Sequence, residues 1–214
     1  MFDGDNEISA RILLEADLSP RVKQIMATCI IEAHKIAKEF WIKNGNLPKT
    51  SKYDASSQLR FIIFRLVAKM VDSEPAARIS YMEPGFNNSP DYWYDSRIKL
   101  QIKKCANANK LPNRSCDREK NAQINNQISL FDSDEFSSGF VLVTYNHKDF
   151  DVQYIQLGVP DADYTMWLHK ESIMDYFDKD MSEEIQKTYG AEMEKAYTEK
   201  IKKNLGLKIS GQGE

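Results

Sequence analysis

The stretch SPDYWYDSRIKLQIKK, residues 89–104, decides the fold class of this chain. Residues 98–104 alternate isoleucine or leucine with lysine or glutamine, and this period of two is typical of a strand with one apolar and one polar face. Residues 92–94 predict a second short strand, and the turn-forming residues 84–90 separate it from a further predicted strand at 77–83. The middle of the chain is therefore predicted to form a sheet.

Two helices are predicted on the N-terminal side of this sheet. The first is capped by Ser19, has Pro20 at its first helical position and ends near Asn44. The second runs over residues 54–71 and carries apolar side chains on more than one face, which indicates burial between other elements. Glu32 falls off the apolar stripe of the first helix, and we expect it to face water.

On the C-terminal side, residues 139–145 (GFVLVTY) and 152–158 (VQYIQLG) predict two strands joined as an antiparallel hairpin. The polar segment 105–126 is predicted to be a loop or a weakly packed helix. Residues 164–177 predict a short helix, and a long final helix is expected to begin at Asp180. The fold class is thus α+β, with N-terminal helices, a central mixed sheet of about five strands, and C-terminal helices.

Length and composition fit a single domain, because the chain has 214 residues of which 42% are hydrophobic. We expect one α+β domain over residues 1–205, with a helical C-terminal part at 164–205, followed by a flexible tail at 206–214. The sequence has no long apolar run, no secretory leader, and three cysteines without metal-type spacing, which together indicate a protein of the reducing cytoplasm. Membrane proteins, secreted disulfide scaffolds and zinc ribbons are therefore disfavoured.

One constellation in the central stretch points to chemistry. Pro90-Asp91 is followed, after nine residues, by Gln101-Ile102-Lys103 on the alternating strand. The period of two places Gln101 and Lys103 on one face of that strand and directs Ile102 into the core. This pattern resembles the signature of the PD-(D/E)XK nuclease superfamily, the fold of many restriction enzymes and repair nucleases.

The resemblance implies a restriction-endonuclease-like core over roughly residues 54–158 and metal-dependent hydrolysis of phosphodiesters at a site formed by Asp91, Gln101 and Lys103. In that family an aspartate and a second acid hold a divalent cation, and the lysine positions or activates the attacking water. Asp91 would then be a ligand of Mg²⁺ or Mn²⁺, Gln101 would occupy the position of the second acid, and Glu83 would supply a further ligand. Gln101 departs from the pattern because it ligates only through a neutral carbonyl oxygen, which weakens Mg²⁺ binding and also suits an inactive relative.

A basic segment surrounds this motif. Residues 97–120 contain eight basic and two acidic side chains, although the whole chain has a net charge of −3. Such a segment can follow a phosphate backbone, and the residues expected to bind nucleic acid are Lys99, Lys104, Lys110, Arg114 and Arg118. The alternative is an ordinary solvated loop.

A second motif lies at residues 127–131, Gln-Ile-Ser-Leu-Phe. It resembles the pentapeptide by which bacterial proteins dock onto the DNA polymerase sliding clamp. The resemblance implies that the Gln127 amide binds in a small pocket while Leu130 and Phe131 fill an apolar one. In the alternative interpretation, the apolar residues of this segment anchor a polar loop to the core.

Two hypotheses follow from these features. The first is a DNA-associated protein of bacterial or phage type that acts as a metal-dependent phosphodiesterase. The second is a non-catalytic interaction protein of a phage or mobile element, which binds and regulates or inhibits a host DNA-replication or defence complex. Under the second hypothesis, the long final helix would serve as a homodimer or partner surface, because its apolar stripe is narrow.

Overall fold

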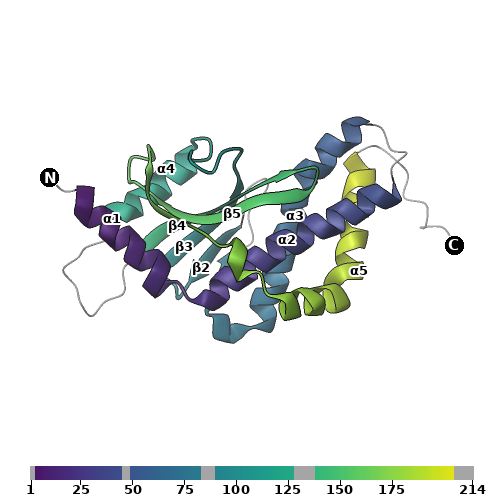
Figure 1. Cartoon of the computed structure of the whole chain (residues 1–214), viewed down its shortest axis with the longest axis horizontal. Coiled ribbons are helices and arrows are strands. Elements are labelled where there is room, and N and C mark those ends of the chain that lie inside the picture. The colour runs from purple at the N-terminus through teal and green to yellow at the C-terminus, as the bar shows by residue number, and fades with distance from the viewer. Residues whose placement is uncertain (1–2, 45–48, 83–89, 128–137, 205–214) are drawn as a thin grey trace.

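A mixed sheet of six strands forms the centre of the molecule, with helices packed on both of its faces (Figure 1). This is the computed structural model of the chain, and it describes residues 3–44, 49–82, 90–127 and 138–204. The α+β class predicted from the sequence is confirmed, and the sheet has one strand more than the five expected. No helix in the described ranges combines the length and the apolar character that crossing a bilayer requires.

The elements follow the predicted order closely through the middle of the chain. The helices are α1 (Asp3–Ile12), α2 (Pro20–Lys43), α3 (Lys49–Ser73), α4 (Cys116–Ala122) and α5 (Lys179–Asn204). The strands are β1 (Ile79–Met82), β2 (Asp91–Tyr94), β3 (Ile98–Lys104), β4 (Gly139–Lys148), β5 (Asp151–Pro160) and β6 (Trp167–Ser172). Ser19 caps α2 as predicted, since its side chain accepts a hydrogen bond from the Val22 amide.

Strand order in the sheet follows the sequence from β1 to β6. Neighbouring strands are antiparallel except for β3 and β4, which run parallel and are joined by a crossover that contains α4. The predicted hairpin between residues 139–145 and 152–158 is confirmed by the antiparallel pairing of β4 with β5. A parallel pair requires a long connection. Here the connection places α4 on the face of the sheet opposite α2, α3 and α5.

The main core lies between one face of the sheet and the helices α2, α3 and α5. On β3, Ile98, Leu100 and Ile102 face this core, as the alternation predicted. A smaller apolar cluster covers the other face, where Ala122 of α4 packs with Phe140 and other residues of the α4 side. Since both faces are covered, the polar residues Lys99 and Gln101 of β3 are buried as well.

Residues 164–177 do not form the predicted helix. They contain β6, which pairs with β5, and a 3₁₀ turn at Met174–Tyr176. Gly158 of β5 makes room for this arrangement, because a Cβ atom at that position would lie 2.5 Å from the Trp167 ring. Pairing with an open sheet edge is a tertiary interaction that no local pattern in this segment reports.

Glu32 is buried and does not face water as expected. Its carboxylate accepts hydrogen bonds from Ser182 (2.6 Å) and Gln186 (2.5 Å) of α5, and from Lys35 at 2.5 Å. The helix α5 packs against α2 and supplies the donors Ser182 and Gln186, so that a side chain outside the apolar stripe of α2 becomes a contact between helices.

The apolar stripe of α5 is covered by the chain itself. Ile185, Met193, Tyr197 and Ile201 are fully buried in the main core against α2 and α3. The stripe from which a homodimer surface was predicted therefore packs within one copy of the chain.

Candidate functional site

Polar side chains converge where β2 begins and β3 ends. Tyr92 pairs with Leu100, so the antiparallel register places Asp91 beside Gln101, one step further along. The Gln101 Nε2 atom donates to Asp91 Oδ1 at 2.6 Å and to Asp117 Oδ2 at 3.0 Å. The structure thus brings together Asp91 and Gln101, which the sequence motif predicted, and adds a second carboxylate.

That second carboxylate, Asp117, was missed in the motif. It stands in the first turn of α4, a helix that begins where Ser115 accepts a hydrogen bond from the Arg118 amide. A capping serine followed by acidic residues in the first turn is a usual start of a helix. Ser115, Asp117 and Glu119 form this pattern, so the sequence could have indicated the start of α4. Nothing local, however, indicates that α4 returns over the end of β3.

Gln101 is the centre of this cluster. Its side chain is 1% exposed, and its Oε1 atom is buried without a hydrogen-bond partner among the described residues. Leaving a buried acceptor unpaired costs about 1–3 kcal/mol, so the position favours a cation or a hydrogen-bond donor next to this oxygen. Rotation of the amide exchanges its nitrogen and oxygen, and the oxygen would then face both carboxylates and any cation between them.

The donor set fits a hard divalent cation. Two carboxylates and an amide oxygen are the oxygen ligands that Mg²⁺ and Mn²⁺ prefer. Among the described residues, no group of three or more histidine, cysteine or acidic side chains could hold a metal, and the cluster here combines two carboxylates with an amide. Glu83, predicted as a further ligand, lies outside the described residues.

Lys103 follows Gln101 by two positions on the same face of β3. Burial, followed by the positive charges of Arg118 and Arg60, lowers its pKa from the usual 10.5 to about 8, and this value includes the opposite effect of Asp117 and Asp91. At pH 8 this amine is neutral in a large fraction of molecules. A neutral amine can accept a proton, so Lys103 is suited to general-base chemistry.

Lys99 has a different role from the one predicted. It was expected to contact nucleic acid, but it is 8% exposed, and its Nζ atom lies 2.7 Å from Asp91 Oδ2. It also donates to Asn121 Oδ1 at 3.0 Å and lies over the Trp93 ring. Because α4 covers this part of β3, the charge of Lys99 is used inside the protein to neutralise Asp91.

The other predicted nucleic-acid contacts divide into two groups. Lys104, Lys110 and Arg118 line a pocket of about 330 Å³ at the end of β3, together with Lys103. Arg114 points elsewhere, since it pairs with Glu119 at 3.3 Å and donates to a backbone oxygen of the 163–164 turn. The basic segment is therefore folded into a definite pocket and is not a uniformly solvated loop.

The pentapeptide at 127–131 is only partly described. Gln127 ends a 3₁₀ helix, η3 (Gln123–Gln127), which follows α4. Leu130 and Phe131 lie outside the described residues. The sliding-clamp interpretation of this segment stays a prediction.

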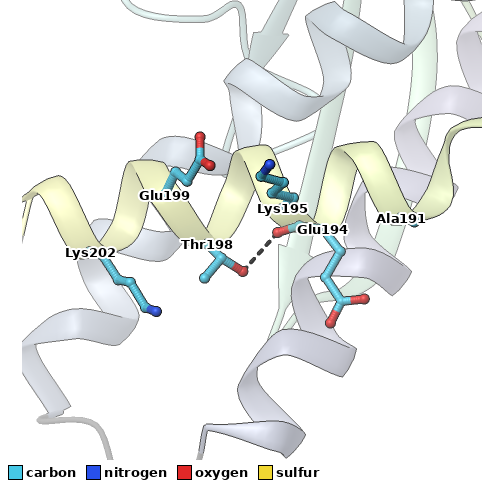
Figure 2. Close-up of a pocket in the computed structure, with 6 residues that line it drawn as sticks. All are labelled: Ala191, Glu194, Lys195, Thr198, Glu199 and Lys202. Carbon is cyan, nitrogen blue, oxygen red and sulfur yellow. Dashed lines mark hydrogen bonds between the residues drawn. The ribbon is translucent and has the colours of Figure 1, made fainter. Parts of the chain in front are cut away.

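A second pocket lies on the outer side of α5, and Figure 2 shows that its side chains do not converge. Glu194 and Glu199 alternate there with lysines, and Thr198 donates to the Glu194 backbone oxygen at 2.7 Å. The Glu194 carboxylate pairs with Lys43 of α2 at 2.7 Å. This surface has balanced charge and serves helix packing.

The chain was compared with protein-family models, with curated proteins and with solved structures, and none of them matches it.

Proposed function

We propose that this protein is a divalent-metal-dependent phosphodiesterase that acts on nucleic acid, in the manner of a restriction or repair nuclease. The observation that supports the proposal best is the convergence of Asp91, Gln101 and Asp117, with the Oε1 atom of Gln101 buried and unpaired. Lys103 projects from the same strand face with a pKa lowered to about 8.

The order of elements around the site also supports the proposal. A helix (α3) precedes the motif, antiparallel strands β1, β2 and β3 run through it, and a further strand, β4, follows after α4. This agrees with the arrangement that the PD-(D/E)XK resemblance implies. The second acid would be supplied by Asp117 of α4, in the crossover, in place of Gln101 on β3.

Each residue of the site has a role that follows from its surroundings. Asp91 and Asp117 would hold Mg²⁺ or Mn²⁺ together with the Gln101 amide oxygen, and the ion would supply positive charge against the developing charge on the phosphoryl oxygens. Lys103, in its neutral form, accepts the proton of the attacking water. Lys99, whose Nζ atom lies 2.7 Å from Asp91 Oδ2, would hold that carboxylate in position until the ion binds.

Calorimetric titration with Mg²⁺ and Mn²⁺ tests the proposal on the wild type, Asp91→Asn and Asp117→Asn. Asp163→Asn, an exposed aspartate in another loop, is the matched control. We expect binding in the wild type and the control, and loss of binding in both site variants. Absence of binding in the wild type, or binding that survives both site substitutions, would contradict the metal site.

A second function is favoured by one observation. Both oxygens of Asp91 already have donors, Lys99 Nζ at 2.7 Å and Gln101 Nε2 at 2.6 Å, so the protein itself supplies part of what a cation would. In this interpretation the chain is a non-catalytic interaction protein that regulates or inhibits a host DNA-replication or defence complex. This second function is favoured if a protein with Asp91→Asn and Lys103→Met keeps its biological effect while Leu130→Ala with Phe131→Ala abolishes it. A pull-down with the sliding clamp then tests whether the clamp is the partner.

A further inference from the structure

The pocket at the end of β3 differs in its charge from the pocket on α5. Four of its lining residues are basic, and no acidic residue lines it. The basic residues are Lys103, Lys104, Lys110 and Arg118. In the pocket on α5, by contrast, two glutamates accompany the two lysines (Figure 2).

The loop that forms the pocket is held in place by hydrogen bonds to the neighbouring strands. The Tyr154 hydroxyl of β5 donates to the Cys105 backbone oxygen at 2.5 Å, and Gln156 Nε2 donates to the Ala108 oxygen at 2.8 Å. Lys170 of β6 donates to the same Ala108 oxygen at 3.1 Å. The pocket wall is therefore built before any ligand arrives, which reduces the entropy lost on binding.

The cations in the pocket repel one another. Burial lowers the pKa of both Lys103 and Lys104, and the positive charge of Arg118 adds to the effect on Lys103. The Arg118 Nε atom is buried without an acceptor in the described part of the chain, although the same guanidinium donates to the Asn113 backbone oxygen. An anion in the pocket would relieve this repulsion and supply acceptors, and Arg with Lys is the usual pair that binds a phosphate group.

We propose that this pocket binds a phosphate group of a nucleic-acid strand, next to the phosphodiester that lies at Asp91 and Asp117. Naming nucleic acid as the source of the phosphate rests on the proposed function. Lys103 lines the pocket and also stands in the candidate site, so the two phosphate positions are adjacent. The pocket thereby holds the strand in register. This matters because the carboxylates repel a phosphate group until a cation binds between them.

The test is fluorescence polarisation of a labelled single-stranded 12-mer in EDTA, where metal-dependent contacts are removed. The variants are Lys110→Gln and Arg118→Gln, and Lys195→Gln on α5 is the matched control. Each lost phosphate contact should reduce the magnitude of the slope of log K against log salt by about 0.7. The ratio of the affinity at 0.1 M salt to the affinity at 1 M salt should then be roughly fivefold smaller in the variant than in the wild type. The control should bind as the wild type does.

The outcomes separate this inference from the proposed function. Wild-type binding by both pocket variants, or equal weakening in Lys195→Gln, would overturn the inference. Binding of inorganic phosphate without binding of the oligonucleotide would overturn nucleic acid as the source. If Asp91→Asn loses metal and cleavage but still binds the 12-mer in EDTA, the pocket stands whatever becomes of the hydrolase. Circular dichroism confirms that Arg118→Gln is folded, and the exposed Lys110→Gln gives the same answer independently.

Discussion

Gln101→Glu tests the central geometry most directly, because it places a third carboxylate where an amide now bridges two. In the absence of metal the variant loses the two hydrogen bonds, of 2.6 and 3.0 Å, that Gln101 Nε2 donates to Asp91 and Asp117. Hydrogen bonds to charged groups contribute about 1.5–3 kcal/mol each, and a protonated glutamic acid can restore one of them. We therefore expect a loss of about 1.5–3 kcal/mol in the free energy of unfolding.

The sign with pH follows from the repulsion. Two unit charges 4 Å apart repel by about 4 kcal/mol at an effective dielectric constant of 20, so the folded variant takes up a proton that the unfolded chain has released at neutral pH. Because the folded state then binds more protons than the unfolded state, stability falls as pH rises. The deficit relative to the wild type should be larger at pH 8 than at pH 5.

Mg²⁺ should reverse the deficit. A ligand at one hundred times its Kd stabilises the folded state by about 2.7 kcal/mol, which matches the expected loss. Thermal unfolding measures both effects, and for a chain of this size we expect Tm to fall by roughly 3–12 °C in EDTA and to recover in Mg²⁺. Gln101→Met is the control, since it removes the same hydrogen bonds without adding charge and should not respond to Mg²⁺. A Gln101→Glu protein that is as stable as the wild type in EDTA and indifferent to Mg²⁺ would refute the convergence of these side chains.

Three further predictions concern the site and the packing. The rate of cleavage should rise with pH through about 8, as Lys103 loses its proton. Arg118→Gln removes a like charge near Lys103 and should move this inflection to higher pH. A pH–rate profile of both proteins measures the shift, and an inflection that stays in place contradicts the prediction. Glu32→Ala should cost about 1–3 kcal/mol in urea unfolding, because it leaves the Ser182 and Gln186 donors unpaired while the half-exposed Lys35 returns to water, and a loss below about 0.5 kcal/mol would mean that the network is open to water. Gly158→Ala should destabilise by about 1–3 kcal/mol, because the added Cβ would meet the Trp167 ring of β6 at 2.5 Å. Gly190→Ala within α5 meets only the end of the Gln186 side chain, at 3.1 Å, and should be the less harmful of the two because alanine favours the helix. A lower Tm for Gly190→Ala than for Gly158→Ala would contradict the packing of Trp167 on β5.

The middle of the fold could be predicted because its signals are local. The alternation at residues 98–104 is the strand β3 itself, and Ile102 faces the core while Gln101 and Lys103 face the other way. The cap at Ser19 begins α2 for an equally local reason, a side chain that satisfies an amide three residues away. The proximity of Asp91 to Gln101 was implied only by the motif resemblance, and it is the antiparallel register of β2 with β3 that provides it.

The sequence by itself therefore determined the strand period, the helix caps and the α+β order, since each depends on residues within a few positions of one another. The tertiary structure alone decided what covers each face. The parallel pairing of β3 with β4 returns α4 over the sheet, and this brings Asp117 to Gln101 and buries Lys99. In the same way, α5 turned Glu32 into an interior residue. Burial of a polar side chain depends on which distant element packs over it, and the hydrophobic period of its own segment carries no information about that element.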